Sequence, residues 1–378
     1  MIEVLEKVQG KTERQRELVR AIRDRSVELV GAFGPSGTGK SFLTLTQALL
    51  LLGRGEYEKL VVGRPVIGVT FEERISSGGS IEAYKEHVRE YILDIVGSLD
   101  PSLREHVDKL ISTGKIEIID PVFLRGRTFD RSIIFVDDIQ NTTIEAVIEA
   151  ITRVGIDSKL IIAGDPVFQH LYPGASRTAV EAWEILRGER GSAVIDLGIS
   201  DVVRPGARRG LRLLLESALR RRRMSETERR VYDAIRLYAP DADVITVISL
   251  VDAKKRLEIE SSHVPDVVII VKPGHVARTI GTGGERIERV EEDTGLMPRV
   301  VELTLDFKQY IRAVHPVSWI HKHVVHADLA GPYVVVRVPQ RYLGAILGQK
   351  GVYARFMDLF FRELLGIGFR VEEARKRS

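Results

Sequence analysis

The sequence contains no cysteine among its 378 residues, which excludes disulfide bridges, cysteine-ligated zinc and thiol catalysis. Long apolar runs are also missing. The longest, around Leu43–Leu52, is about half of a membrane-spanning length. The first residues, MIEVLEKVQGKTERQRELVR, are too charged for a signal peptide. We therefore expect a cytoplasmic, soluble protein with no membrane association.

A strong charge of one sign is absent as well, because the formal net charge is only +3. Overall charge therefore does not by itself indicate a nucleic-acid partner. Arginine is nevertheless concentrated between Val203 and Arg236. Such a cluster is either a solvated helical face or a track for phosphate groups, and both interpretations stay open. The hydrophobic content of 44% is ordinary for a globular protein of two or three domains.

The N-terminal half alternates between short apolar runs and amphipathic, helix-like stretches. This alternation predicts a parallel sheet with helices on both faces. Nearly continuous apolar runs such as SIIFV and KLIIA favour buried parallel strands. The predicted strands are Val27–Phe33, Lys59–Val62, Ile116–Ile119, Ser132–Val136, Lys159–Ala163 and Ala193–Leu197.

A glycine-rich loop follows the first predicted strand and precedes a helical pattern. Its sequence fits GxxxxGK[ST], in which glycines let backbone N–H groups point at phosphate oxygens at a helix N-terminus. The lysine would reach the β- and γ-phosphates of a nucleoside triphosphate, and the final hydroxyl would ligate Mg²⁺. The loop consists of Gly34, Pro35, Ser36, Gly37, Thr38, Gly39, Lys40 and Ser41.

A second acidic site ends the predicted strand Ser132–Val136. Asp137 is the candidate that shares Mg²⁺ with Ser41, and Asp138 is the candidate that polarises the attacking water. Gln140 follows at once and is expected near the γ-phosphate. Gln169 lies after the next strand, where a doubly wound sheet places its ligand crevice. It is predicted to sense the γ-phosphate, with an ordinary polar loop as the alternative.

The stretch DDIQNTTIEAVIEAITRVGIDSKLIIAGDPVFQHL resembles the PhoH-like ATPases, whose core is similar to superfamily 1 helicases. The resemblance covers about Thr12 to Leu219 and includes GPSGTGKS, Arg64-Pro65, Leu124–Arg127 and Asp201–Arg204. It implies ATP hydrolysis with Mg²⁺ and assembly into a homo-oligomer, such as a ring. It also implies that Gln15 contacts adenine. Arg204 is implied as an arginine finger, acting within its own subunit or on a neighbour.

Two features depart from that family. The family usually has Asp-Glu where this chain has Asp137-Asp138, and Val66–Ser80 replaces a glycine-rich segment. The shorter Asp138 carboxylate lies further from the water, and a displacement of about 1 Å can cost on the order of a hundredfold in rate. Slow hydrolysis is therefore an open alternative.

The C-terminal part carries two GxxG loops, each between a short helix and an amphipathic helix. Helix–GxxG–helix is the RNA-binding element of KH domains, where a loop without large side chains lets nucleotides approach the backbone. The pair resembles the tandem KH domains of archaeal NusA-like proteins over about Asp243 to Ala374. This implies single-stranded RNA as partner. The expected contact residues are Arg278, Gly281, Thr282, Gly283, Gly284, Arg286, Gly348, Gln349, Lys350 and Gly351. Modules that keep the fold without RNA are the alternative.

Three lesser features have plainer interpretations. Ser225 and Glu228 have the spacing of a capping box and predict a new helix after the arginine run. His315, His321, His323 and His326 are interpreted as a polar inter-domain surface, with metal binding as the alternative. Trp319 and Tyr342 are interpreted as core residues, with base stacking as the alternative.

The predicted fold class is α/β: a P-loop NTPase with a doubly wound parallel sheet, followed by two small α+β KH (type II) domains. The expected domains are an ATPase domain at 1–220, a basic helical linker at 221–242, and KH domains at 243–313 and 314–378. The predicted function is an RNA-binding, Mg²⁺-dependent ATPase that remodels RNA or RNA–protein complexes. An RNA-binding adaptor with ATP as a slow switch is the main alternative, and a small-molecule kinase is the weaker one.

Overall fold

The structure is a computed structural model that describes residues 1–65, 81–124, 126–168 and 177–374. The chain divides into two compact units, Met1–Ala207 and Arg208–Ser378. The division falls before the boundary expected near residue 220, because most of helix α9 (Pro205–Arg221) is assigned to the second unit. Within the described residues, no helix is long and apolar enough to cross a membrane.

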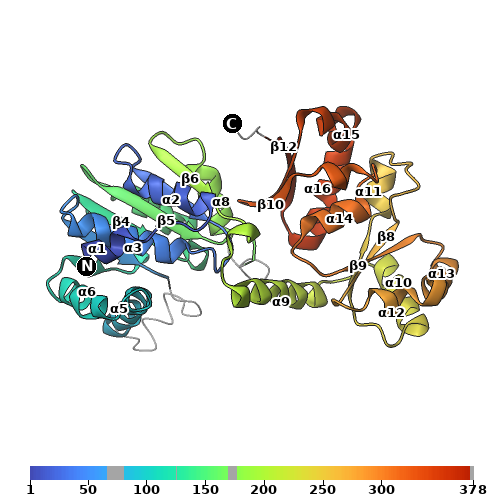
Figure 1. Ribbon diagram of the computed structural model, residues 1–378, viewed down its shortest axis with the longest axis horizontal. Helices are drawn as coiled ribbons and strands as arrows, with labels where there is room; N and C mark the ends of the chain where they lie inside the picture. The colour runs from blue at the N-terminus through green and yellow to red at the C-terminus, as the bar shows by residue number, and fades with distance from the viewer. Residues whose placement is uncertain (66–80, 125, 169–176, 375–378) are drawn as a thin grey trace. The chain divides into compact units, whose positions relative to one another are not determined.

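The first unit is built on a six-stranded sheet with the order β3-β2-β4-β5-β1-β6. Every strand pair in it is parallel, which confirms the predicted α/β architecture (Figure 1). Each predicted strand matches an observed one within about two residues. The strands are β1 (Leu29–Phe33), β2 (Lys59–Gly63), β3 (Ile116–Ile118), β4 (Ser132–Val136), β5 (Lys159–Gly164) and β6 (Ser192–Asp196).

Helices cover both faces of this sheet, because alternate residues of each strand point to opposite sides. On one face, Val30, Phe135 and Ile161 join a core formed with α1 (Ile2–Glu6), α2 (Glu13–Arg23), α3 (Lys40–Gly53), α5 (Ile81–Gly97) and α6 (Ser102–Ser112). On the other face, a Cβ added to Gly31 would contact Leu186 of α8 (Thr178–Leu186), so that helix packs closely. Helix α7 (Ile144–Ile151) packs against α8.

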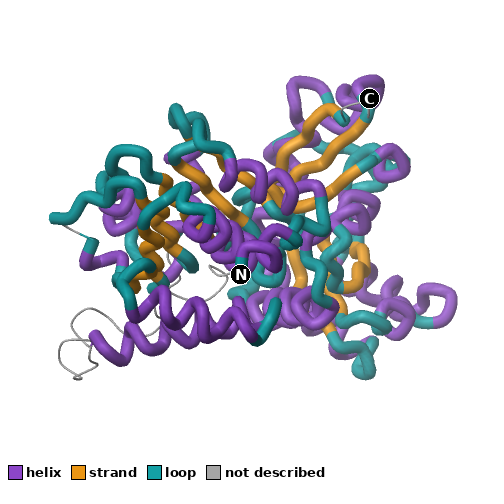
Figure 2. The backbone as a smooth tube through the Cα atoms, turned by 60° about the vertical axis from the view of Figure 1, so that its left-hand side comes forward, coloured by secondary structure: helices purple, strands orange, loops and turns teal. Residues whose placement is uncertain are grey.

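The second unit contains two modules with the same topology. In the first, the sheet order is β7-β8-β9, with β7–β8 antiparallel and β8–β9 parallel. In the second, the order β10-β11-β12 repeats this pattern of one antiparallel and one parallel pair. Figure 2 shows these strands in orange among the surrounding helices.

The first module consists of α10 (Glu226–Tyr238), β7 (Val244–Ser249), α11 (Val251–Arg256), β8 (Val267–Val271), α12 (Val276–Ile280), α13 (Glu285–Thr294) and β9 (Pro298–Glu302). The predicted capping box is confirmed, since the Ser225 side chain accepts from the Glu228 N–H and the Glu228 side chain accepts from the Ser225 N–H. Val231 and Ile235 of α10 share a core with Ile269 of β8. Helix α10, from the expected linker, is therefore packed into the module.

The second module consists of α14 (Phe307–Val314), β10 (His326–Ala330), β11 (Tyr333–Val338), α15 (Leu343–Leu347), α16 (Val352–Leu365) and β12 (Gly368–Glu373). Its core is aromatic: Tyr310 and Phe361 lie with ring centroids 6.4 Å apart, and Phe361 stacks on Phe369 at 5.6 Å. The two modules thus share a topology but differ in how their cores are filled.

Candidate nucleotide site and paired glycine loops

The strand order brings the predicted nucleotide residues to one edge of the first sheet. Carboxyl ends of parallel strands meet at the same edge, and β5 lies between β1 and β4. The glycine-rich loop follows β1, Asp137 follows β4, and Asp165 follows β5. The Arg64 that follows β2 reaches the same edge, because its guanidinium bonds Asp138.

The glycine-rich loop wraps around the Lys40 ammonium. Lys40 Nζ donates to the carbonyl oxygens of Gly34 at 2.6 Å and Pro35 at 3.1 Å, and its side chain is buried. The Thr38 hydroxyl donates to the Pro35 oxygen at 2.8 Å. At Gly34 φ is +152°, and an added Cβ would come within 2.3 Å of the Leu197 carbonyl oxygen. Glycine is required there because the backbones approach so closely.

Asp137 and Ser41, the predicted magnesium pair, lie together. The fully buried Asp137 carboxylate accepts a hydrogen bond from the Tyr91 hydroxyl, and the Ser41 hydroxyl lies beside it. Burial, followed by the negative charge of Asp138, raises the pKa of Asp137 above its ordinary value, while the two hydroxyls act in the opposite direction. The site therefore contains a desolvated carboxylate beside a hydroxyl, a combination that a divalent cation would stabilise.

Asp138 is held by an arginine and a glutamine. The guanidinium of Arg64 donates to Asp138 Oδ2 through two nitrogens, at 2.9 and 2.7 Å. Gln140 donates to Asp138 Oδ1 at 3.0 Å and accepts from the Asp165 N–H at 3.1 Å. The Arg64 guanidinium also lies 4.1 Å from the centroid of the Tyr91 ring. This network fixes Asp138, whose φ of +51° is in the left-handed region.

Asp165 places a further carboxylate close to Lys40. Its Oδ1 accepts from the N–H groups of Val167 at 2.9 Å and Phe168 at 3.0 Å. Its Oδ2 is buried and has no hydrogen-bond partner within the described part of the chain. Burial raises the pKa of Asp165 and the charge of Lys40 lowers it. A buried oxygen without a partner indicates a place for a donor such as water or a ligand.

The donor set at this edge fits Mg²⁺ bound together with a nucleotide. No group of three or more His, Cys, Asp or Glu side chains in the described residues could hold a metal on its own. Mg²⁺ commonly takes only one or two protein oxygens and completes its shell with water and substrate phosphates. Ser41 and Asp137 supply such a pair, so these residues fit a Mg²⁺–nucleotide complex.

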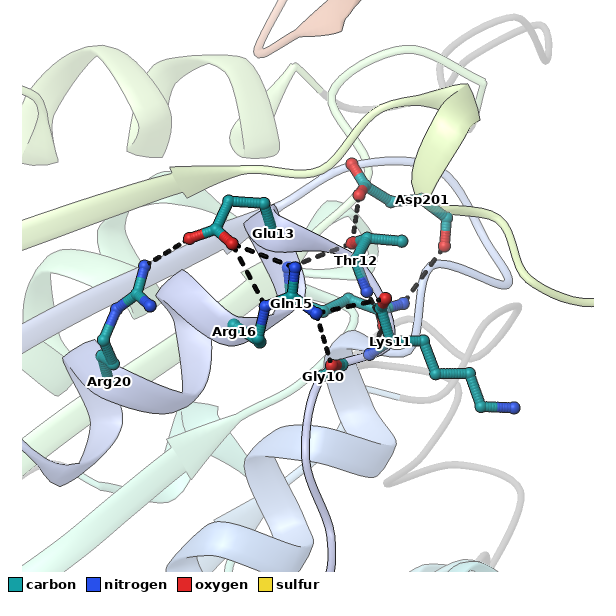
Figure 3. A network of polar contacts seen from close by, with 8 residues as sticks. All are labelled: Gly10, Lys11, Thr12, Glu13, Gln15, Arg16, Arg20 and Asp201. Atoms are coloured by element: carbon teal, nitrogen blue, oxygen red, sulfur yellow. Dashed lines mark hydrogen bonds and ion pairs between the residues drawn. The ribbon is translucent and has the colours of Figure 1, made fainter. Parts of the chain in front are cut away.

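Gln15 lies against the glycine-rich loop from the first turn of α2. Its amide nitrogen donates to the carbonyl oxygens of Thr38 at 2.8 Å and Asp201 at 3.1 Å. Its amide oxygen accepts from the N–H groups of Lys11 and Thr12. Figure 3 shows Thr12 and Gln15 directed at Asp201, whose carboxylate accepts from the Thr12 hydroxyl. For Gln15 to contact adenine, its side-chain amide would have to give up one of these hydrogen bonds.

Arg204 is exposed, in the turn between Asp201 and α9. Gln169, Arg125 and Val66–Ser80 lie outside the described residues. Tyr91 and Asp201 were not chosen as site residues from the sequence. A signal for Tyr91 was present, since it lies at helical spacing from the buried Val88 and Ile92 of α5 and packs against the same core, where a tyrosine hydroxyl requires a partner.

The two GxxG loops have nearly the same backbone conformation. Gly281 has φ and ψ of 81° and 173°, and Gly348 has 70° and 172°. An added Cβ would come within 2.7 Å of the Arg286 side chain at Gly281 and within 2.6 Å of the Tyr353 ring at Gly348. Glycine at the first position is therefore required by both its backbone angles and its neighbours. The repeated geometry indicates that both loops are copies of the same structural motif.

The basic residues beside the loops have different surroundings. Arg286 bonds the Asp241 carboxylate and donates to the Arg278 carbonyl oxygen at 2.7 Å, so it braces the first loop. Arg278 and the second-loop residues Gln349 and Lys350 are exposed. Lys350 has φ of +52° where the first loop has Gly283 at +65°. A lysine held in the left-handed region is strained, and such strain is often retained at functional positions.

Two interpretations of residues between α14 and β10 were wrong, those of His315 and Trp319. His315 is completely buried: its Nδ1 accepts from the Val317 N–H at 3.0 Å, so its Nε2–H donates to the Ile346 oxygen at 3.0 Å. It therefore belongs to the interior and not to a polar surface. Trp319 is 45% exposed and so is not a core residue. The sequence did not distinguish these environments because both residues lie in an irregular segment without periodicity.

The sequence profile of the PhoH-like protein family matches residues 7–216, which include the glycine-rich loop, Asp137 and Arg204. A PhoH-like protein of Bacillus subtilis (strain 168) is 35% identical over 198 residues, covering 52% of this chain and 60% of the relative. Protein PhoH of Escherichia coli (strain K12) is 25% identical over 195 residues, covering 52% and 54%. The chain thus spans little more than half the length of these relatives.

A solved structure of the DUF1998 helicase MrfA bound to DNA is also similar to the chain. The TM-score is 0.33 at 12% identity, with 100% of this chain and 48% of that chain covered. This likeness is weak.

Proposed function

The chain belongs to the PhoH-like protein family, and from this premise we propose that its first unit binds ATP with Mg²⁺ and hydrolyses it. The observation that carries the proposal is the meeting of Lys40, Ser41 and Asp137 at one sheet edge, with the Ser41 hydroxyl beside the buried Asp137 carboxylate. A phosphate-binding loop and a buried acid on a nearby strand are the two elements that this chemistry requires.

Each residue has a defined task in the proposed reaction. The Lys40 ammonium leaves the Gly34 and Pro35 carbonyl oxygens and binds the β- and γ-phosphates. Ser41 and Asp137 hold Mg²⁺, which supplies neutralisation of phosphate charge when bound. Asp138 accepts a hydrogen bond from the attacking water and orients it. Arg64 and Gln140 fix the Asp138 carboxylate for this task.

The test is steady-state release of inorganic phosphate from ATP with the full chain. Lys40→Ala is expected to lower turnover by roughly 10²–10³-fold, because it removes a preorganised charge from the transferred phosphoryl group. Lys59→Ala, on β2, is the control that should leave turnover unchanged. Phosphate release without any co-substrate excludes the kinase. A single turnover followed by no further release would favour the slow-switch alternative.

We also propose that the second unit binds single-stranded RNA through two KH-type modules. Two helix–GxxG–helix elements with matching backbone angles support this, in modules that share one strand order. In such elements the loop lets the sugar–phosphate backbone approach the protein backbone closely. ATP hydrolysis in the first unit would then remodel RNA, or displace proteins from it.

Carboxylates placed in the loops test RNA binding. Thr282→Asp and Gln349→Asp put negative charge beside the expected phosphates and should weaken binding of a single-stranded oligoribonucleotide about 10-fold or more at low salt. Thr282→Asn and Gln349→Asn keep the size without the charge and serve as controls. Equal affinity of all four variants and the wild type would contradict the RNA proposal and leave the ATPase proposal intact.

We propose, finally, that Arg204 completes the ATP site of a neighbouring subunit in a homo-oligomeric ring. Its exposure supports this, because an arginine finger must be free to reach a partner. Lys40→Ala and Arg204→Ala subunits should each be inactive alone. An equal mixture should recover activity if Arg204 acts across an interface. No recovery in a mixture shown to contain mixed oligomers would place Arg204 in its own subunit's site.

A further inference from the structure

The second module carries a partly exposed cluster of aromatic side chains, from the segment between α14 and β10 and from the N-cap of α15. Trp319 lies edge-to-face with His323 at a centroid distance of 5.6 Å and with Tyr342 at 6.1 Å. His323 and Tyr342 are stacked, with centroids 3.8 Å apart and an interplanar angle of 17°. We call these three residues the aromatic platform. Since Trp319 is 45% exposed, the platform presents the indole of Trp319 to solvent.

The platform is continuous with the second GxxG loop. Tyr342 is the N-cap of the five-residue helix α15, and Gly348, the first glycine of the loop, is its C-cap. At 1.5 Å of rise per residue, the loop begins about 9 Å from Tyr342. An RNA strand bound at the loop would therefore pass within reach of the platform.

The two segments that form the platform carry charge of one sign. Neither 316–325 nor 339–357 contains an Asp or Glu, although the chain has 53 of them. The same two segments contribute Lys322, Arg341 and Lys350. Arg341 also lies over the Tyr342 ring, 4.8 Å from its centroid. Cations around an exposed aromatic surface complement a ligand that is both flat and negatively charged.

The first module provides an internal comparison. No Trp, Tyr or Phe occurs between Asp243 and Glu302. His275 is the N-cap of α12 as Tyr342 is of α15, but its Nδ1 accepts from the Asp243 N–H at 2.9 Å. Glu285 and Glu288 lie in the first turn of the helix that follows the first loop. The same fold thus carries an aromatic cluster on acid-free segments in only one of its two copies.

We propose that the aromatic platform is a stacking site for an unpaired RNA base, adjoining the phosphate contacts of the second GxxG loop. The inference rests on the proposed RNA binding of the second unit and assigns base contact to its second module. Trp319 is the surface on which the base stacks, and the neighbouring rings fix its orientation before binding. Little conformational entropy is then lost on binding.

The experiment uses the full chain with an adenine octaribonucleotide and an abasic octamer of the same length. Trp183, the other tryptophan, is 3% exposed, so a fluorescence change on binding reports Trp319. The adenine octamer should quench this emission. Trp319→Leu should abolish the quenching and weaken binding about 5- to 100-fold, because a stacked base is replaced by an aliphatic contact. The dependence on salt concentration should be unchanged, since no phosphate contact is removed.

Matched controls separate the platform from other effects. Trp319→Phe should retain most of the affinity, and Phe123→Ala, which removes a 50% exposed aromatic from the first unit, should retain all of it. The melting temperature of each variant checks the fold. The abasic octamer should bind the wild type about as weakly as the adenine octamer binds Trp319→Leu.

Two negative results have different meanings. Equal affinity of the wild type and Trp319→Leu for an octamer that binds would overturn the base-stacking site alone. The platform would then be a surface for a protein partner. No binding of either octamer to the wild type at low salt would overturn this site together with the proposed RNA function.

Discussion

At the scale of single residues, Tyr91 is a contact that sequence reasoning did not find. Its hydroxyl donates to the Asp137 carboxylate, and its ring lies under the Arg64 guanidinium. The sequence identified Asp137 because an acid at the end of a buried strand is conspicuous. Tyr91 reaches Asp137 from a different helix, and no spacing rule relates positions that meet only through tertiary packing.

Tyr91→Phe is expected to raise the Mg²⁺ concentration needed for half-maximal ATP turnover by about 10-fold or more. Partners that orient a ligating carboxylate typically contribute 10- to 100-fold to metal affinity or activity. The measurement is a Mg²⁺ titration of turnover at saturating ATP. Tyr57→Phe, in the hydrophobic core of the same unit, is the control. An unchanged Mg²⁺ requirement in a correctly folded variant would remove Tyr91 from the site.

His315 predicts a pH dependence of stability. Burial lowers its pKa below the ordinary value of 6.5, and a proton on Nδ1 would oppose the Val317 N–H. The unfolded chain then binds more protons than the folded one below about pH 6.5. Stability of the second unit should therefore be constant above that pH. Below it, stability should fall by at most about 1.4 kcal/mol per pH unit.

Denaturant unfolding of the full chain between pH 5 and 8 measures this effect. His315→Gln, which retains a donor for the Ile346 oxygen, should flatten the profile. His263 also influences the His315 imidazole, so His263→Asn is examined in parallel. His321→Gln, at a half-exposed position, should retain the wild-type profile. A slope that persists in His315→Gln would assign the pH dependence to another group.

At the scale of helices and strands, the pattern of apolar residues was sufficient to predict those strands that are buried along their whole length. Strands such as β4 and β5 are buried along their whole length and are flanked by Asp or Gly, so their ends were visible in the sequence. Helix α10 was recognised as a helix from its capping box, but its place in a module core was not. That place depends on Val231 and Ile235 facing β8, a contact between distant segments.

Lys350→Gly should have opposite effects on stability and on RNA affinity. Lys350 has φ of +52°, and relief of that strain outweighs the added freedom of glycine in the unfolded chain. The free energy of unfolding should rise by up to about 1 kcal/mol. Loss of the ammonium group should weaken RNA binding and lower the slope of log affinity against log salt by about 0.7, the value for one single-strand phosphate contact.

Denaturant unfolding and salt-dependent RNA titrations of the same variant measure both quantities. Gln349→Gly, at the neighbouring exposed position, removes a side chain without removing charge and should leave the salt slope unchanged. Weaker binding with an unchanged slope in Lys350→Gly would mean that this lysine supports the loop and makes no phosphate contact.

At the scale of the whole molecule, the proposed function requires that the two units influence each other. If ATP binding changes the affinity for RNA by some factor, RNA must change the affinity for ATP by the same factor. Couplings of this kind are typically about 5- to 150-fold. The expected result is therefore a matched pair of shifts: the RNA affinity with and without a non-hydrolysable ATP analogue, and the analogue affinity with and without RNA. Lys40→Ala should remove both shifts while leaving the affinity for RNA alone unchanged, because Lys40 lies in the first unit.

Two affinities that stay independent, with both ligands bound, would contradict ATP-driven remodelling of RNA. The chain would then carry an ATPase and an RNA-binding unit that act separately.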